Sequence, residues 1–231
     1  LTNTRSIKLN QLVINRLKRD PSMELELWFS IGSTYTYLTV MRMKEIERKH
    51  DISLRLMPFS VRQIMLDMNN APFPPSKASK VKYMWRDIER RATKYGFPAT
   101  VPAPYPLQEF DRANKIALVG LQDGWIKDYV LQSYINWFQG GLEAGGDENL
   151  AKTCTALSLN MDDIIARSQS QEIDELYKKQ TSVAAKKGIF GSPSFIVDNE
   201  VFWGDDRLED AIGWLRNLSL IHISEPTRRS Y

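Results

Sequence analysis

Apolar and polar residues alternate along two short segments near the start of the chain, and the segment between them has helical spacing. Residues 24–30, within MELELWFSI, alternate and are rich in strand-forming residues, which predicts a strand. Residues 34–49 are predicted to form a helix, and residues 52–59, ISLRLMPF, a second strand. The core face of that helix would carry Tyr37, Leu38, Met41 and Ile46. A strand, a helix and a strand in this order predict a parallel unit with a right-handed crossover.

The spacing of apolar residues is helical from about residue 60 to residue 187, and no convincing strand occurs there. The apolar residues of segment 77–95 fall on one helix face. Residues 96–106 contain four prolines, which predicts an extended loop. Further helices are predicted at residues 107–122, 125–139, 147–158, 160–168 and 171–187.

Strand character returns near the C-terminus. Residues 194–197 and 201–203 are predicted to form a hairpin with its turn at Asp198 and Asn199. The segment DRLEDAIGWLRN, residues 206–217, predicts a closing amphipathic helix. The complete order predicts an α/β, thioredoxin-like fold with a large all-helical insertion between the second and third strands.

A division into domains follows from this order. The thioredoxin-like domain comprises residues 23–59 and 188–217, and the helical insertion comprises residues 60–187. Residues 1–22 are basic and mildly amphipathic, which permits an organellar-targeting segment, but a disordered extension is the favoured interpretation. Residues 218–231 break the preceding helical pattern, and we expect a non-native or disordered tail there.

Charge and composition exclude several functional classes. The net charge is +3, but residues 23–217 hold 24 basic and 26 acidic residues, so the excess of positive charge belongs to the two ends of the chain. A nucleic-acid partner is therefore not expected. No apolar run approaches the roughly 18–20 residues that a membrane-spanning helix needs, so no membrane partner is expected either.

Cysteine and histidine are scarce. The single cysteine, Cys154, allows no internal disulfide and no Cys-x-x-Cys pair, which indicates a reducing compartment, and we expect a cytoplasmic location. His50 lies in a predicted surface turn and His222 in the predicted tail, so a Ser-His-Asp hydrolase has no evident base. No His-x-x-x-His pair or cysteine cluster is present, so we expect no metal site.

The remaining candidates for chemistry are Ser33, the tyrosine pair Tyr35 and Tyr37, Pro193, Asp205 and Asp206. Ser33 stands between a strand and a helix, where backbone N–H groups favour a bound anion, although for this residue taken alone the favoured interpretation is that its hydroxyl caps the helix. Pro193, in GSP, could be an ordinary loop proline. Asp205 and Asp206, in WGDDR, could cap the last helix.

Together these features resemble one family. STYT at residues 33–36, Asn70 after the second strand and GIFGSPSFIVDNEVFWGDDR at residues 188–207 flank the helical insertion. The combination resembles the kappa-class glutathione transferases and the bacterial 2-hydroxychromene-2-carboxylate isomerases, which have a DsbA-like thioredoxin fold. The resemblance covers residues 24–217, and its most specific part is Gly-x-Phe-Gly-x-Pro followed by a hairpin and Gly-x-Asp-Arg.

The resemblance implies that glutathione is the cofactor. Ser33 matches the family's catalytic serine, which donates a hydrogen bond to the glutathione thiolate. Thr34 and Thr36 replace the proline and the second serine of the family's Ser-Pro-Tyr-Ser motif. Asn70 matches an asparagine that contacts glutathione, with Asn69 one register shift away.

The resemblance also assigns the C-terminal motifs to glutathione. Pro193 matches a cis-proline, and the main-chain N–H and C=O of Ser192 would pair with the cysteinyl main chain of glutathione in the manner of an added strand. Asp205 and Asp206 match contacts to the γ-glutamyl end, where a carboxylate can meet the ammonium group. We therefore expect a cis Ser192–Pro193 bond close to Ser33.

The predicted function is a glutathione-dependent isomerase or transferase that acts on an electrophilic aromatic or unsaturated keto-acid substrate. A thiolate near the first turn of a helix, hydrogen-bonded by Ser33, is favoured over the thiol. Both reactions need that thiolate, so the sequence does not separate them.

Two alternatives stay open. One is a non-catalytic thioredoxin-like module that binds a peptide at the Pro193 loop. The other is a DsbA-like disulfide oxidoreductase, although positions 33 and 36 carry no cysteine. The expected partners are a small-molecule substrate and a second copy of the chain in a homodimer. The side chains that could line a substrate pocket, or else belong to the core, are Trp85, Tyr105, Trp137 and Trp203.

Overall fold

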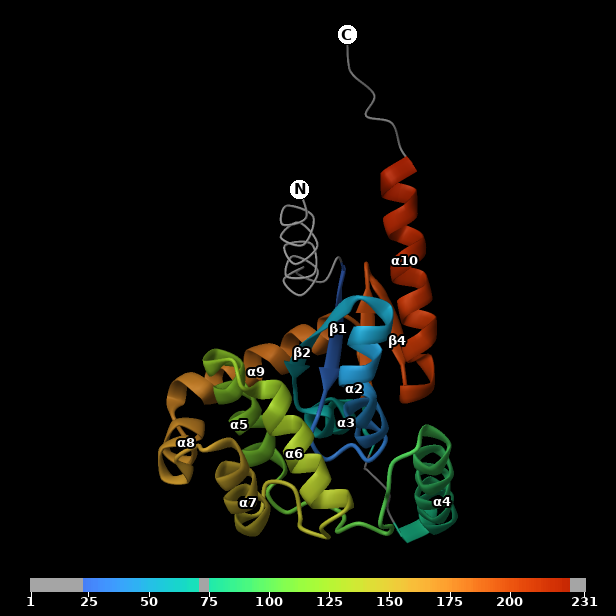
Figure 1. Cartoon of the computed structure of the whole chain (residues 1–231). Coiled ribbons are helices and arrows are strands. Elements are labelled where there is room, and N and C mark those ends of the chain that lie inside the picture. The colour runs from blue at the N-terminus through green and yellow to red at the C-terminus, as the bar shows by residue number, and fades with distance from the viewer. Residues whose placement is uncertain (1–22, 71–74, 225–231) are drawn as a thin grey trace, which may run out of the picture.

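A four-stranded mixed sheet lies at the centre of the computed structural model, and helices surround it (Figure 1). The structure describes residues 23–70 and 75–224, so the predicted extension at 1–22 and the end of the predicted tail, 225–231, lie outside it. The elements are β1 (Met23–Phe29), α2 (Thr36–His50), β2 (Ile52–Pro58), α3 (Val61–Asp67), η1 (Pro75–Lys77), α4 (Ala78–Tyr95), α5 (Phe110–Asp123), α6 (Ile126–Phe138), α7 (Asp147–Leu157), α8 (Met161–Ser168), α9 (Gln171–Lys186), β3 (Ser194–Val197), β4 (Glu200–Trp203), η2 (Asp205–Arg207) and α10 (Leu208–Ser224).

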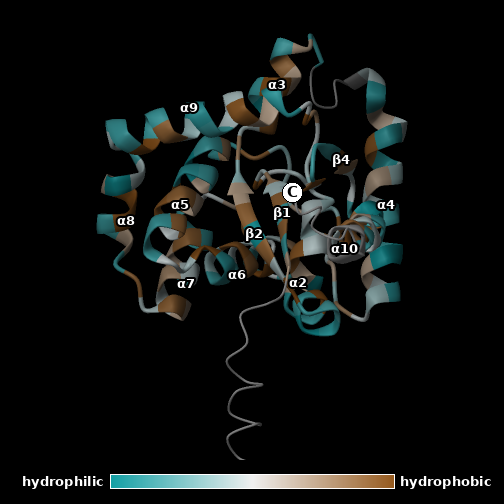
Figure 2. Ribbon diagram, turned by 90° about the horizontal axis from the view of Figure 1, so that it is seen from above, coloured by the Kyte–Doolittle hydropathy of each residue, from teal (hydrophilic) through white to brown (hydrophobic). Residues whose placement is uncertain are grey.

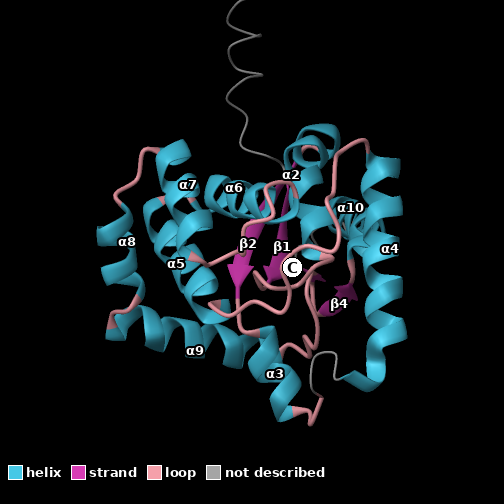
Figure 3. Cartoon of the chain, turned by 90° about the horizontal axis from the view of Figure 1, so that it is seen from below, coloured by secondary structure: helices cyan, strands magenta, loops and turns pink. Residues whose placement is uncertain are grey.

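The strand order in the sheet is β2-β1-β3-β4. β1 and β2 are parallel, whereas β3 is antiparallel to both β1 and β4. All four residues of β3 are buried and β1 and β2 are mostly buried, whereas β4 at the other edge of the sheet is exposed or half-buried. Helices surround the sheet (Figure 3). The register places Ser194 opposite Trp28, so the loop that precedes β3 lies beside the turn that follows β1. The predicted thioredoxin-like fold with its helical insertion is confirmed.

The helices of the insertion separate into two groups. Helices α5 to α9 gather on the side of β2, whereas α4 lies apart from them in all three views (Figures 1–3). The outer helices carry both hydrophilic and hydrophobic residues, as expected of amphipathic helices (Figure 2). Within the described ranges, no helix is both long enough and apolar enough to cross a membrane.

The structure adds one helix to the prediction and lengthens another. Helix α3 was not predicted; it begins after Ser60, whose hydroxyl accepts a hydrogen bond from the Gln63 N–H at 3.2 Å and so caps the helix. Helix α10 continues to Ser224, beyond the predicted end at residue 217. It continues because Leu215 and Leu218, one helical turn apart, both pack against the core.

Candidate active site

The turn after β1 and the loop before β3 meet at one end of the sheet. The Ser33 hydroxyl donates a hydrogen bond to the main-chain oxygen of Ser192, with an Oγ–O distance of 2.6 Å. The Ser192–Pro193 peptide bond is cis. The Ser192 hydroxyl lies in the interior, where it accepts a hydrogen bond from the Ser30 N–H at 2.8 Å and lies 2.9 Å from Thr36 Oγ1. Ser33, Ser192 and Pro193 therefore lie together.

The Ser33 hydroxyl does not cap α2. The helix begins at Thr36, two residues later than predicted, and its N-cap residue is Tyr35, which makes no side-chain cap hydrogen bond. Ser33 lies in the preceding turn, with its hydroxyl directed at the proline loop. The capping interpretation is wrong, and the hydroxyl is placed where a ligand at the proline loop would meet it.

Two buried polar side chains of the insertion hold this turn in place. The Asn114 side chain on α5 accepts a hydrogen bond from the Ile31 N–H at 2.8 Å and donates one to the Ile31 carbonyl at 3.0 Å. The Tyr134 hydroxyl on α6 donates to the Ser33 carbonyl at 3.0 Å. Sequence reasoning missed both residues, although an asparagine on the buried face of a helix is itself a signal, because a buried amide needs partners.

A pocket of about 340 Å³ opens beside Ser33. Ser33, Ser192 and Asn70 line it, together with side chains that are mainly apolar or aromatic. The charged side chains among its described lining residues are Arg62 and Lys80, and no carboxylate is among those residues. The pocket therefore suits a ligand that combines apolar surface with negative charge.

Of the two candidate asparagines, Asn70 lines the pocket and Asn69 does not. Asn70 lines the pocket and its side-chain oxygen accepts a hydrogen bond from Lys77 Nζ at 3.4 Å. Asn69 adopts a positive φ of 53° and is not among the lining residues. Asn70 is thus the better placed of the two for a contact with glutathione, which stays a prediction.

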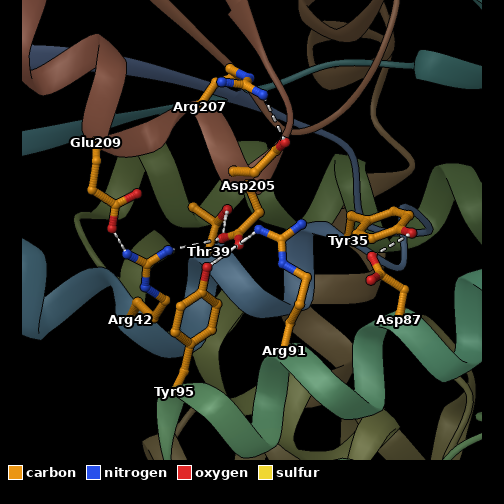
Figure 4. Close-up of polar contacts among 10 residues, drawn as sticks. Tyr35, Thr39, Arg42, Asp87, Arg91, Tyr95, Asp205, Arg207 and Glu209 are labelled. Carbon is orange, nitrogen blue, oxygen red and sulfur yellow. Dashed lines mark hydrogen bonds and ion pairs between the residues drawn. The ribbon is translucent and has the colours of Figure 1, made fainter.

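Asp205 lies in a buried network instead of in the pocket (Figure 4). Its side chain has 0% exposure, and it accepts hydrogen bonds from Thr39 Oγ1 at 2.9 Å, Arg91 Nη2 at 2.5 Å and the Tyr95 hydroxyl at 3.3 Å. Arg42 Nη1 lies 3.5 Å from the same carboxylate. Burial raises the pKa of the Asp205 carboxyl, and the two guanidinium groups oppose that rise.

This placement corrects the prediction for Asp205. A carboxylate enclosed by protein donors is not accessible to the ammonium group of a ligand, so Asp205 has a structural role. It joins η2 to Arg42 on α2 and Arg91 on α4. Asp206 is exposed at 53% and forms an ion pair with Arg207 at 3.2 Å, outside the pocket lining, so its contact with glutathione stays a prediction.

Tyr35, within the STYT segment, and Tyr37, directly after it, have different roles. Tyr35 lines the pocket and donates a hydrogen bond to Asp87 at 3.0 Å. Burial, strengthened by the neighbouring Asp87 carboxylate, raises the pKa of Tyr35, so its hydroxyl stays protonated. Tyr37 is fully buried, donates to the Pro98 carbonyl and stacks on Phe138, which makes it a core residue.

The four aromatic candidates divide between pocket and core. Tyr105 and Trp203 line the pocket. Trp137 is fully buried and donates its indole N–H to the Pro104 carbonyl at 2.8 Å. Trp85 is not a lining residue but packs edge to face on Tyr105.

Cys154 is outside the pocket lining, and its replacement by alanine is expected to change turnover at saturating glutathione by less than about twofold. The thiol is buried on α7 and does not line the pocket. Burial raises the pKa of the Cys154 thiol, which opposes formation of a reactive thiolate. Steady-state kinetics of the Cys154→Ala variant, with circular dichroism to confirm folding, check this. Loss of activity in a folded variant would instead indicate a mechanism that uses the protein's own thiol.

Known proteins resemble this chain in both sequence and fold. A 2-hydroxychromene-2-carboxylate isomerase of Sphingobium xenophagum is 25% identical over 186 residues, covering 80% of this chain and 94% of that protein. Glutathione S-transferase kappa 2 of Caenorhabditis elegans is 21% identical over 204 residues, covering 83% and 91%. A solved structure of a 2-hydroxychromene-2-carboxylate isomerase matches with a TM-score of 0.75 at 23% identity, covering 88% of this chain and 100% of that one.

The family model described as the DSBA-like thioredoxin domain matches residues 24–212. This range includes β1 with the Ser33 turn, the helical insertion and the proline loop with its hairpin. The resemblance seen in the sequence is confirmed, and the chain belongs to the DsbA-like thioredoxin domain family.

Proposed function

We propose that this protein is a glutathione-dependent isomerase or transferase in which Ser33 stabilises the glutathione thiolate. One observation carries the proposal: the Ser33 hydroxyl and the Ser192 main-chain oxygen meet at 2.6 Å on the wall of a pocket of about 340 Å³. The similarity to proteins named as 2-hydroxychromene-2-carboxylate isomerases and as a kappa-class glutathione transferase supports isomerase or transferase chemistry.

Ligand binding would exchange the partners of these two groups. In the structure, the Ser33 hydroxyl donates to the Ser192 carbonyl. The N–H of the glutathione cysteinyl residue would donate to that carbonyl, as in an added β-strand, and the Ser33 O–H would then turn to the sulfur. A hydrogen bond to an ionised group contributes about 1.5–3 kcal/mol, which lowers the pKa of the bound thiol.

The thiolate would attack an electrophilic carbon of the substrate. With an unsaturated keto acid, the sulfur–carbon bond forms as the electron pair of the double bond moves to the carbonyl oxygen. In an isomerase, the single bond thus created rotates, the electron pair returns and the thiolate leaves unchanged. In a transferase, a proton is captured and the thioether is released as product.

Calorimetric titration with glutathione tests the proposal first, and turnover of an enone in the presence of glutathione tests it second. Binding together with turnover supports a glutathione-dependent enzyme. Binding without turnover of any enone would favour the peptide-binding alternative. Absence of binding at millimolar glutathione would overturn the proposal. The oxidoreductase alternative requires a thiol in the pocket, and no cysteine is among the described residues that line it.

A further inference from the structure

One cation of the pocket has no carboxylate partner among the described residues. Arg62, at the start of α3, lines the same pocket as Ser33 and forms no ion pair within residues 23–70 and 75–224. By contrast, Arg42 and Arg91 both lie against Asp205. Arg62 therefore retains its positive charge for a ligand.

The guanidinium of Arg62 is held in a defined position. Its central carbon lies 4.4 Å from the centre of the Phe110 ring, and Nη2 donates a hydrogen bond to the Leu107 carbonyl at 3.3 Å. A guanidinium has five N–H donors in a planar arrangement, so most of them remain after one contact. A stacked, pre-oriented guanidinium with remaining donors is suited to bidentate binding of a carboxylate.

The rim of the pocket offers aromatic surface. Phe190 and Trp203 pack edge to face with ring centres 4.9 Å apart, and they are 43% and 53% exposed. Gly191 lies under the Trp203 indole, where any Cβ would collide with it, so the proline loop can approach this ring only with glycine at that position. Met68, which also lines the pocket, is 58% exposed. Exposed rings and a cation that line the same pocket form a site for a ligand with an aromatic body and an acidic end.

We propose that Arg62 is a specificity-determining residue that binds the carboxylate of an aromatic acid substrate, whose ring lies against Phe190 and Trp203. The assignment of that acid as a substrate rests on the proposed function. Glutathione also carries carboxylates that a guanidinium can bind. The test must therefore distinguish a substrate carboxylate at Arg62 from a glutathione carboxylate there. Lys80 is a second cation of the pocket and is left unchanged in the test.

Arg62→Met keeps an apolar stem over Phe110 and removes the charge, and Arg62→Lys keeps the charge without the planar fork. With glutathione saturating, kcat/KM is measured for benzylidenepyruvate and for benzylideneacetone, which differ in the carboxylate. We expect Arg62→Met to lower kcat/KM about tenfold to hundredfold for the acid and less than about twofold for the ketone, with partial recovery in Arg62→Lys. Arg86→Gln, at an exposed arginine of α4 outside the pocket, is the matched control and should leave both values unchanged.

A binding experiment separates this inference from the proposed function. Calorimetry without glutathione compares trans-cinnamate with cinnamamide, and calorimetry with glutathione alone measures its Kd. Tighter binding of cinnamate than of cinnamamide, lost in Arg62→Met, supports the acid site even if the wild type does not bind glutathione. Equal losses for acid and ketone, or a weaker glutathione Kd with no change in acid selectivity, would overturn the assignment to the substrate while leaving glutathione-dependent chemistry intact.

Discussion

Replacement of Ser33 by alanine is expected to lower turnover with glutathione about tenfold to hundredfold, because the lost hydrogen bond to the thiolate contributes about 1.5–3 kcal/mol. The pKa of the bound thiol should rise, so the pH at which activity reaches half its maximum should also rise. The fold should persist, since Tyr134 holds the turn through the Ser33 carbonyl and not through the hydroxyl. Ultraviolet absorbance of the bound thiolate, followed against pH, measures the pKa directly.

Ser170→Ala is a matched control for this substitution. The Ser170 hydroxyl caps α9, accepting a hydrogen bond from the Ile173 N–H at 3.3 Å, and it does not line the pocket. We expect that change to lower the free energy of unfolding by about 1 kcal/mol and to leave the thiol pKa unchanged. If Ser33→Ala behaves like Ser170→Ala, losing stability without a change in thiol pKa, then Ser33 has no catalytic role.

The fold could be predicted from the sequence because the periodicity of apolar residues assigns the elements and their order then limits how the strands connect. Apolar and polar residues alternate in residues 24–30 and 52–59, and the segment between them has helical spacing. This pattern predicts two parallel strands joined by a helix, and such a connection is right-handed. The same topology brings the loop before β3 to the end of β1, and the Ser33–Ser192 contact follows from that placement. Helix α3 escaped prediction because its seven residues are too few to show a clear period.

The parts of the site that the sequence could not supply depend on contacts between distant segments. Asn114 and Tyr134 contact the Ser33 turn from helices more than eighty residues further along the chain. A motif match placed Asp205 near glutathione, but the side chain's surroundings depend on Arg91, 114 residues away. Arg62 had no motif to mark it, and only the pocket distinguishes it from a surface arginine.

Replacement of Asp205 by asparagine is expected to lower the free energy of unfolding by about 3–5 kcal/mol, since it leaves Arg91 without its buried counterion and Arg42 with only the half-exposed Glu209. For a chain of this size, that corresponds to a fall in Tm of roughly 6–20 °C. The loss should be large because the carboxylate joins three segments: α2 through Thr39 and Arg42, α4 through Arg91, and η2 itself. Thermal unfolding followed by circular dichroism, or denaturant titration, measures it.

Asp206→Asn, at the next position in the same motif, isolates this effect. Asp206 is 53% exposed and pairs only with exposed Arg207 among the described residues, so its replacement should change stability by less than about 0.5 kcal/mol. Glutathione titration of both variants then separates structure from ligand contact. A weaker glutathione Kd in Asp206→Asn, with Tm unchanged, would support the γ-glutamyl contact predicted there. Small and equal losses of stability in the two variants would contradict the structural role of Asp205. If Asp205→Asn instead bound glutathione more weakly with an unchanged Tm, Asp205 would be a glutathione ligand, as the resemblance implied.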